Sequence, residues 1–211
     1  MSDNLATYIS TTEDALPETL CVELRAFLDE YDMYAEGTNY GDGENTASRK
    51  IQLVEKFTHA DQSYVRAYET ILDAVKPVLT DLVNSSVIPT VYPISAPVFA
   101  PIQVRKMLGP TRKHSDNVSP FSLFNELAPQ VGYRVVTLIL TLSDTTHQLI
   151  FPKQQHSVKL KRGLLVSFPP YWMFEHYTTG DDSIRYSLTT WLNETRPLVP
   201  EECLPLRPRS A

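Results

Sequence analysis

Residues 133–142, YRVVTLILTL, and residues 183–192, SIRYSLTTWL, carry the strongest fold signal in this chain. Both are rich in β-branched and aromatic side chains, the residue types that favour strands. Shorter runs of the same kind occupy residues 98–107, 147–151, 157–160, 164–168 and 174–178. Proline, glycine, asparagine and aspartate separate these runs, so we expect short strands joined by turns. This pattern is typical of a β-sandwich or a jelly roll.

The chain before these strands has a helical pattern. Apolar residues recur at helical spacing between Pro17 and Tyr31, which predicts a first helix. A second helix is expected to begin after Asp61, a suitable N-cap, and Pro77 should kink it or split it in two. Its expected buried face consists of Tyr64, Tyr68, Ile71, Leu72, Val75, Leu79 and Leu82.

Residues 34–50, between the two helices, are rich in glycine, asparagine, threonine and aspartate, which predicts a loop. This loop could be a lid over a site or a plain surface loop. We therefore expect an α+β chain in which residues 1–195 form one catalytic domain. Within it, residues 1–86 are the helical part and residues 87–195 the jelly-roll core. Residues 196–211 hold several prolines and no periodicity, which indicates a C-terminal tail.

Composition excludes several classes of protein. The chain has 211 residues, of which 42% are hydrophobic, and a formal net charge of -6. An acidic balance argues against a dedicated nucleic-acid binder. The longest apolar runs are too short to span a membrane, and the N-terminus lacks the features of a signal peptide. Cys21 and Cys203 make neither a disulfide framework nor a four-ligand zinc site, so we expect a cytoplasmic protein.

His114 and Asp116 form an H-x-D pair in the segment KHSDN. On an extended strand, side chains two residues apart share a face, so the imidazole and the carboxylate can converge on one point. Taken alone, the pair is equally compatible with a surface turn, because short motifs of this kind arise by chance.

A second histidine and an arginine give the pair a chemical meaning. His176 precedes Arg185, and strand alternation places Ser187 and Thr189 on the same face as Arg185. Two histidines and one carboxylate form the facial triad that binds iron(II) and leaves coordination positions open. A guanidinium suits the far carboxylate of a bound 2-oxo acid. The alternative is a solvent-exposed face on which Arg185 is a solvated edge charge.

Five strings in the chain resemble the catalytic core of the iron(II)/2-oxoglutarate-dependent dioxygenases, in particular the prolyl-4-hydroxylase-like branch. The strings are GPTRKHSDN, YRVVTLILTLSD, QLIFP, LKRGLLVSFPPYWMFEH and RYSLTTW, in the order found in that family. The resemblance implies a double-stranded β-helix, that is, a jelly-roll core, with the N-terminal helices packed on one sheet.

The resemblance also implies site residues. His114, Asp116 and His176 match the iron ligands. Arg185 matches the partner of the 2-oxoglutarate C5 carboxylate, and Ser187 and Thr189 match hydroxyl positions beside it. Many relatives carry a tyrosine that touches 2-oxoglutarate where this chain has Thr141. The implied cofactors are iron(II) and 2-oxoglutarate, with dioxygen as a further co-substrate.

Two residues are candidates for substrate contacts. His147 stands where relatives often have paired glycines near the substrate mouth, and it is otherwise expected on the surface. Trp172 belongs to an aromatic patch at residues 171–174 that should wall the pocket or fill the core. The basic cluster of Lys153, Lys159, Lys161 and Arg162 reads as a solvated hairpin turn or as a contact for an acidic partner.

The expected reaction is the hydroxylation of a C–H bond in a peptidyl proline, another protein residue or a free amino acid, with release of succinate and CO2. The expected partner is therefore a peptide, protein or amino-acid substrate, without nucleic acid or membrane, and the oligomeric state is left open. Two alternatives remain. One is a non-catalytic jelly-roll binding or structural protein with a vestigial metal triad. The other is a cupin-like metalloenzyme that uses the same ligands without 2-oxoglutarate.

Overall fold

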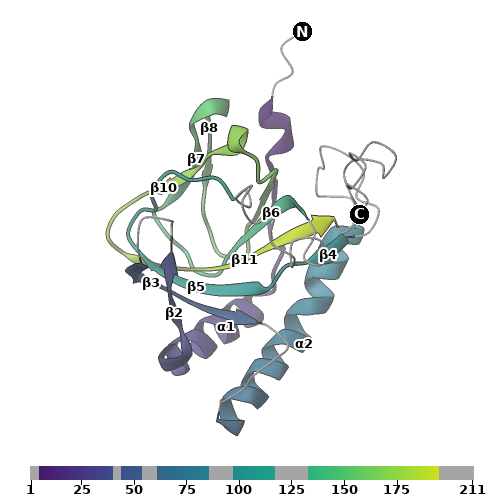
Figure 1. Ribbon diagram of the computed structural model, residues 1–211, viewed down its shortest axis with the longest axis vertical. Coiled ribbons are helices and arrows are strands. Elements are labelled where there is room, and N and C mark those ends of the chain that lie inside the picture. Colours follow the sequence, from purple (N-terminus) through teal and green to yellow (C-terminus); the bar gives the residue numbers. More distant parts are fainter. Residues whose placement is uncertain (1–4, 40–43, 54–60, 86–96, 117–132, 195–211) are drawn as a thin grey trace, which may run out of the picture.

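The computed structural model describes residues 5–39, 44–53, 61–85, 97–116 and 133–194, and Figure 1 gives their arrangement. Two helices, α1 (Glu18–Glu30) and α2 (Gln62–Asn84), lie beside a large antiparallel sheet. Both helices begin where the sequence predicts. The carboxylate of Asp61 caps α2 by accepting a 2.8 Å hydrogen bond from the backbone N–H of Ser63. Helix α2 continues through Pro77, so the expectation that proline splits it is wrong.

The large sheet has the strand order β1-β9-β6-β11-β5-β3-β2, and β4 pairs with β11 outside this path. All of these pairs are antiparallel. The strands are β1 (Ser10–Thr12), β2 (Glu36–Asn39), β3 (Glu44–Leu53), β4 (Pro97–Phe99), β5 (Ile102–Leu108), β6 (Tyr133–Thr141), β9 (Leu165–Phe168) and β11 (Ile184–Glu194). The small sheet consists of β7 (Gln148–Phe151), β8 (His156–Lys159) and β10 (Tyr177–Thr179). Every strand run predicted from the sequence contributes a strand to one of these sheets.

The prediction of a loop at residues 34–50 is wrong. Strands β2 and β3 pair with each other there, and β3 also pairs with β5, with Ile51 opposite Val104. Strands near a sheet edge tolerate polar residues, so their composition resembles that of a loop. The tip of the suggested lid, residues 40–43, lies outside the described residues.

Strand β1 was also missed, because three residues are too few to show a period. It pairs with β9, so the part of the chain expected to hold two helices and a loop contributes three strands to the large sheet. The tail at residues 196–211 lies outside the described residues. Neither described helix is long and apolar enough to cross a membrane.

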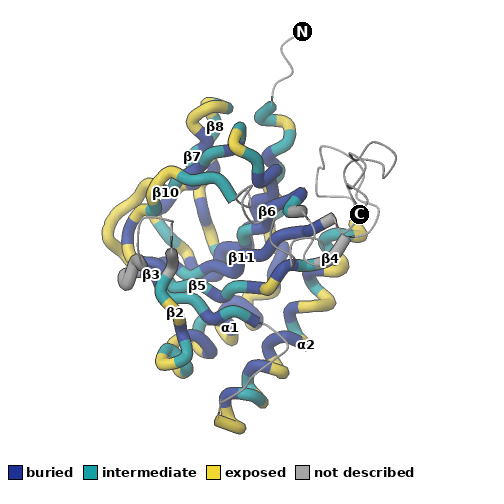
Figure 2. Tube along the Cα trace, viewed as in Figure 1, coloured by how far each residue is buried: buried dark blue, intermediate teal, exposed yellow. Residues whose placement is uncertain are grey.

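The helices cover one face of the large sheet. Leu24 and Leu28 of α1 and Val75 of α2 belong to the same buried cluster as Val104 of β5 and Leu188 of β11. Figure 2 shows that burial is concentrated in the central strands and on the sheet-facing side of the helices. Because strand side chains alternate between faces, the residues flanking Leu188 point the other way. The large sheet is therefore apolar toward the helices, and its opposite face is free to carry polar groups.

Polar contacts reinforce the docking of α1. Asp29 accepts hydrogen bonds from Lys106 of β5 at 2.7 Å and from the Tyr186 hydroxyl of β11 at 2.9 Å. These contacts link the C-terminal half of α1 to the two strands that carry the polar face. A second apolar cluster ties the small sheet to β9, with Leu149, Phe151 and Phe168 among its members. The small sheet is thereby held close to the polar face of the large one.

Candidate metal centre

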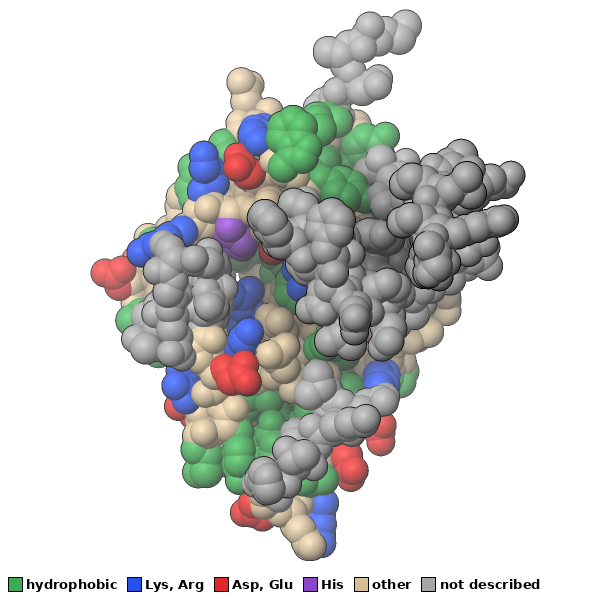
Figure 3. Space-filling view, in the orientation of Figure 1, with side chains coloured by type: hydrophobic (Ala, Val, Ile, Leu, Met, Phe, Trp, Pro, Cys, Tyr) green, Lys and Arg blue, Asp and Glu red, His purple; other side chains and the backbone are tan. Residues whose placement is uncertain are grey.

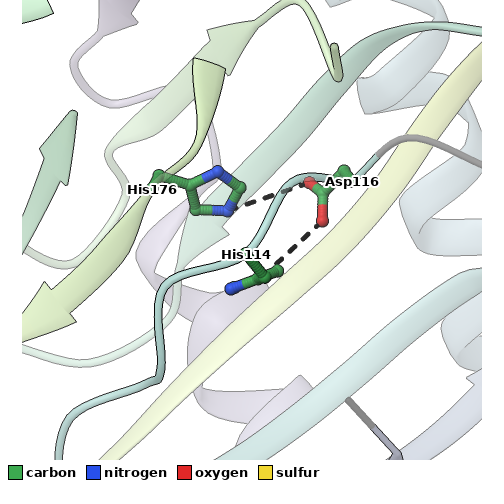
Figure 4. Close-up of side chains that lie close together, drawn as sticks. All are labelled: His114, Asp116 and His176. Carbon is green, nitrogen blue, oxygen red and sulfur yellow. Dashed lines mark ion pairs between the residues drawn. The ribbon is translucent and has the colours of Figure 1, made fainter. Parts of the chain in front are cut away.

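Three side chains from two distant segments of the chain converge between the two sheets. His114, Asp116 and His176 each offer one ligand atom, and these atoms all lie within 4.8 Å of one another. The Nε2 atom of His114 is 3.7 Å from Asp116 Oδ1, and that of His176 is 4.0 Å from Asp116 Oδ2. Figure 4 shows the three side chains pointing toward one another. Pairs of metal–ligand bonds of about 2 Å can span such gaps.

The backbone brings the two histidines together. His114 and His176 form an isolated antiparallel bridge, in which the His114 N–H donates to the His176 carbonyl at 3.0 Å. The His176 N–H returns a hydrogen bond of 2.8 Å to the His114 carbonyl. This bridge fixes the separation of the two rings, whose centroids are 4.4 Å apart.

Hydrogen bonds also set the tautomer of each ring. The Nδ1 atom of His114 lies 2.8 Å from the Arg112 carbonyl, and that of His176 lies 3.1 Å from the Phe174 carbonyl. A carbonyl only accepts, so each Nδ1 must carry the proton and donate. In the neutral form of each ring, Nε2 then presents its lone pair toward Asp116, as a metal-binding imidazole requires.

Asp116 is held at both its side chain and its backbone. Thr137 of β6 donates a hydrogen bond of 2.9 Å to Oδ2, and Arg134 donates one of 2.9 Å to the Asp116 carbonyl. The Arg134 guanidinium also stacks 3.7 Å above the ring of Trp191 on β11. These contacts anchor the carboxylate to the two central strands, and sequence reasoning did not identify either donor.

Electrostatics favour the metal-binding forms of Asp116 and His176. Burial alone would raise the pKa of Asp116, but the charges of His176 and His114 and the Thr137 hydrogen bond outweigh it and lower that pKa. Burial lowers the pKa of His176, although the Asp116 carboxylate opposes this change. The result is a carboxylate beside a neutral imidazole, which is the protonation state that a metal needs.

A pocket extends from these three residues between the sheets and encloses about 550 Å³, including its open mouth. Figure 3 shows a hollow on this face, with a histidine at its rim and Lys or Arg atoms below it. The described lining residues are Arg105, Met107, Thr111, His114, Asp116, Ile139, Thr141, Leu149, Leu160, His176, Thr178, Arg185, Tyr186, Ser187 and Thr189. All four residues suggested from the sequence for binding an organic acid are thus in one pocket with the triad.

Arg185 is 4% exposed, so its side chain is buried in the protein and is not a solvated charge. Its guanidinium donates a hydrogen bond of 2.9 Å to the Thr178 hydroxyl of β10 and contacts the Met107 sulfur at 3.6 Å. Thr178 is itself held by Thr111, whose hydroxyl is 3.0 Å away. A buried guanidinium positioned by neutral groups is suited to bind a carboxylate.

Two hydroxyls of the pocket point to a polar ligand. The side-chain oxygens of Ser187 and Thr141 are buried, and neither has a hydrogen-bond partner among the residues that the structure describes. Buried hydroxyls are rarely left without partners, so each such group needs an explanation. An organic acid bound in this pocket would satisfy both hydroxyls. The lining therefore fits a 2-oxo dicarboxylate, and the donor set of the three clustered residues fits iron(II).

Arg105 also lines this pocket, from β5, and sequence reasoning missed it. The alternation of the strand at residues 98–107 places Arg105 on the same face as Met107, which was the available signal. Without the register between β5 and β11, however, nothing in the sequence tells which face of β5 meets the pocket.

Neither of the two suggested substrate contacts is among the described residues that line this pocket, and their roles toward a substrate stay predictions. His147 is fully buried, not on the surface, with Nδ1 2.6 Å from the Thr145 hydroxyl, and it is not one of the described lining residues. Trp172 is 64% exposed and packs under Lys153, so it neither walls the pocket nor fills the core. His147 lies in a segment between strands and Trp172 begins a short 3-10 helix, and no periodic pattern predicts the direction of such side chains.

The basic cluster behaves as a solvated turn. Lys153 pairs with Glu175, Lys161 with Glu13, and Arg162 with Glu18. Acidic side chains of the same chain therefore meet these three positive charges, which does not favour a docking site for an acidic partner.

Comparison with known proteins identifies solved structures that have a similar fold. No protein-family model matches the chain, and no curated protein matches it. Among solved structures, a viral collagen prolyl hydroxylase from Paramecium bursaria Chlorella virus-1, in complex with 2-oxoglutarate, aligns with a TM-score of 0.59 and 16% identity. That alignment covers 90% of this chain and 97% of the viral one.

Two further structures agree. A Pseudomonas putida prolyl-4-hydroxylase aligns with a TM-score of 0.58 and 18% identity, over 91% of this chain and 96% of that one. A prolyl hydroxylase from Trichoplax adhaerens, in complex with a peptide fragment of hypoxia inducible factor, aligns with a TM-score of 0.58 and 15% identity. It covers 90% of this chain and 86% of that one. The chain therefore shares its fold with these prolyl hydroxylases, which agrees with the resemblance of its sequence.

Proposed function

We propose that the protein is an iron(II)- and 2-oxoglutarate-dependent dioxygenase that hydroxylates a C–H bond. In this proposal His114, Asp116 and His176 hold the iron, and the two sheets form a double-stranded β-helix around it. The two Nε2 lone pairs and one carboxylate oxygen are the donor set of the facial triad. These three residues would hold the ion, and the remainder of the pocket would be left for the other reactants.

The same proposal gives the cosubstrate its place. Arg185 pairs with the C5 carboxylate of 2-oxoglutarate, and its contact with Thr178 holds the guanidinium in position. The hydroxyls of Ser187 and Thr141, buried and without described partners, donate to the same molecule, and Thr189 lines its path. The Thr141 side chain is shorter than the tyrosine of many relatives, so it extends less far into the pocket toward the cosubstrate.

Iron(II) together with 2-oxoglutarate and dioxygen supplies the oxidising power for the reaction. One oxygen atom enters the C–H bond as hydroxyl, and the other enters succinate as 2-oxoglutarate loses CO2. The chain itself binds and orients the reactants. Apolar residues of the lining, Ile139, Leu149 and Leu160, exclude water around the reacting centre. No acid or base of the chain is required for this balance.

The observation that carries the proposal is a single pocket containing both the His-Asp-His cluster and a buried arginine. The triad alone would suit several metals and reactions. The buried Arg185 adds the requirement for an acidic ligand beside the metal. The two hydroxyls that lack a partner among the described residues add places for its oxygens.

For the substrate we propose a peptidyl proline, another protein residue or a free amino acid. A peptide-bound prolyl hydroxylase among the similar folds favours a peptide or protein. The predictions of a cytoplasmic location and of no nucleic-acid partner rest on the sequence alone.

The direct experiment measures succinate release from 2-oxoglutarate by the iron(II)-loaded protein with a panel of proline-containing peptides and free amino acids. Mass spectrometry should find a product heavier by one oxygen atom, in equal amount to succinate. Turnover that continues without 2-oxoglutarate would favour a metalloenzyme using other chemistry. A protein that neither binds metal nor gains stability from 2-oxoglutarate would favour the non-catalytic alternative, because a ligand of the native state must raise its stability.

A further inference from the structure

Arg105 belongs to a row of three directly opposed residues on the face of the large sheet that forms the floor of the pocket. The strand register places Arg105 of β5 directly opposite Ser187 of β11, and Ser187 directly opposite Thr141 of β6. Side chains that are directly opposite in an antiparallel pair stand on the same face, close to each other. All three line the pocket, so this row presents one guanidinium and two hydroxyls to the same space.

The row lies between the metal cluster and Arg185. At one end of the floor, Thr137 binds Asp116 and stands opposite Trp191; at the other end, Arg185 stands opposite Met107. Ser187 is two residues from Arg185 toward the metal end, a step of about 7 Å along the strand. Arg105 therefore enters the pocket nearer to the metal than Arg185 does.

The strand register sets the order of the two guanidiniums, because Arg105 and Arg185 both line the pocket but stand in different rows. The only carboxylate among the described lining residues is Asp116, which belongs to the metal cluster.

Two guanidiniums on neighbouring rows repel each other, and a dicarboxylate lying between them and the metal relieves that repulsion. The hydroxyls of Ser187 and Thr141 in the row of Arg105 have no described partner. A guanidinium beside two free hydroxyls is a suitable binding site for one carboxylate.

We infer that Arg105 is a second cosubstrate-binding residue, which holds the carboxylate at the metal end of the 2-oxo acid while Arg185 holds the far one. The inference rests on the proposed function, and it assigns to Arg105 a role that neither the sequence resemblance nor the comparisons give it. Many relatives have a tyrosine at the position of Thr141. In this chain Arg105, on the other side of Ser187, would provide a contact to the same ligand.

Binding to the manganese(II)-loaded protein tests the inference without turnover. Isothermal titration calorimetry compares 2-oxoglutarate with 2-oxovalerate, which has the same 2-oxo acid end but a methyl group in place of the far carboxylate. Arg105→Ala should weaken both probes by a similar factor of about ten to a hundred, the range for hydrogen bonds to charged groups. Arg185→Ala should weaken 2-oxoglutarate and leave 2-oxovalerate unchanged.

Lys50→Ala is the matched control. Lys50 stands opposite Arg105 on β3, so it has the same charge and the same face, but it is not among the described lining residues. Its removal should change neither affinity. Arg105→Lys keeps the charge and guards against misfolding of the alanine variant; it should bind both probes better than Arg105→Ala does.

Each other result is decisive. If Arg105→Ala binds both acids as the wild type does, or loses only 2-oxoglutarate, the assignment of the metal-end carboxylate to Arg105 is wrong. If Arg105→Ala affects the KM of a peptide or amino-acid substrate and neither 2-oxo acid, the guanidinium serves the substrate and the inference is overturned. If the wild type binds neither acid in the presence of manganese(II), the proposed function itself fails.

Discussion

Replacing Thr137 by valine should weaken metal binding although Thr137 is not a metal ligand. Its hydroxyl donates a 2.9 Å hydrogen bond to Asp116 Oδ2, and this bond orients the carboxylate toward the two histidines. Thr137→Val keeps the shape of the side chain and removes the donor. Groups that orient metal ligands in this way typically account for about ten- to hundred-fold in metal affinity.

The magnitude also follows from the bond itself. A hydrogen bond to a charged group contributes about 1.5–3 kcal/mol, which corresponds to roughly ten- to hundred-fold at about 1.4 kcal/mol per tenfold. Because Thr137 is fully buried, no water can replace the lost donor. The upper part of the range is therefore expected.

Competition with a fluorescent chelator measures the affinity for manganese(II) or iron(II) under anaerobic conditions. Thr190→Val is the matched control, since Thr190 is equally buried but donates to the Ala100 carbonyl at 3.0 Å, away from the metal cluster. Both variants should lose similar free energy of unfolding, and only Thr137→Val should lose metal affinity. Equal metal affinities in the two variants would refute the role given to Thr137.

Further substitutions test other parts of the account. His176→Ala should abolish metal binding in calorimetry while the circular dichroism spectrum stays that of the wild type. Leu188→Ala should lower the free energy of unfolding by about 2–5 kcal/mol in urea, because Leu188 is fully buried under the helices, whereas Ile184→Ala, which is 48% exposed, should lower it far less. Gly180→Ala should destabilise the protein in the same assay, since its φ is +152° and the added Cβ would lie 2.5 Å from the His147 ring. The free energy of unfolding of the metal-free protein should fall as the pH drops below about 6.5. Burial lowers the pKa of His147 and His176, so the unfolded chain takes up protons at a pH where the folded chain does not. A free energy of unfolding that stays constant from pH 7 to 5 would contradict this.

The helices and most strands could be predicted because their signals are local. The alternation of Arg185, Ser187 and Thr189 with Leu188 predicts two faces of different character, and the structure has an apolar face toward the helices and a polar face toward the pocket. Strand β3 could not be recognised in this way. Its residues 44–50, ENTASRK, are polar, and it becomes a strand through its pairing with β5.

The candidate site was predictable to the extent that its residues form motifs. His114-x-Asp116 and the distal His176 follow known spacing, and the fold brings them together. Thr137 and Arg105 carry no motif, because their positions depend on which residues of neighbouring strands are opposite each other. Register is set by long-range pairing, so a single sequence does not reveal it.

The surroundings of His147 and Trp172 were the least predictable part. His147 and Trp172 were chosen for their chemistry and their place in the sequence, yet one is buried against Gly180 and the other is exposed beside Lys153. Turns and short 3-10 segments direct both side chains, and their geometry depends on packing that no periodic pattern encodes.

The most direct test of the metal and cosubstrate site is a crystal structure of the protein soaked anaerobically with manganese(II) and 2-oxoglutarate. The account predicts one anomalous peak about 2 Å from the Nε2 atoms of His114 and His176 and from a carboxylate oxygen of Asp116. It also predicts 2-oxoglutarate extending from that ion to the guanidinium of Arg185. An ion bound elsewhere, or a pocket in which the acid does not reach Arg185 at saturating concentration, would contradict the account.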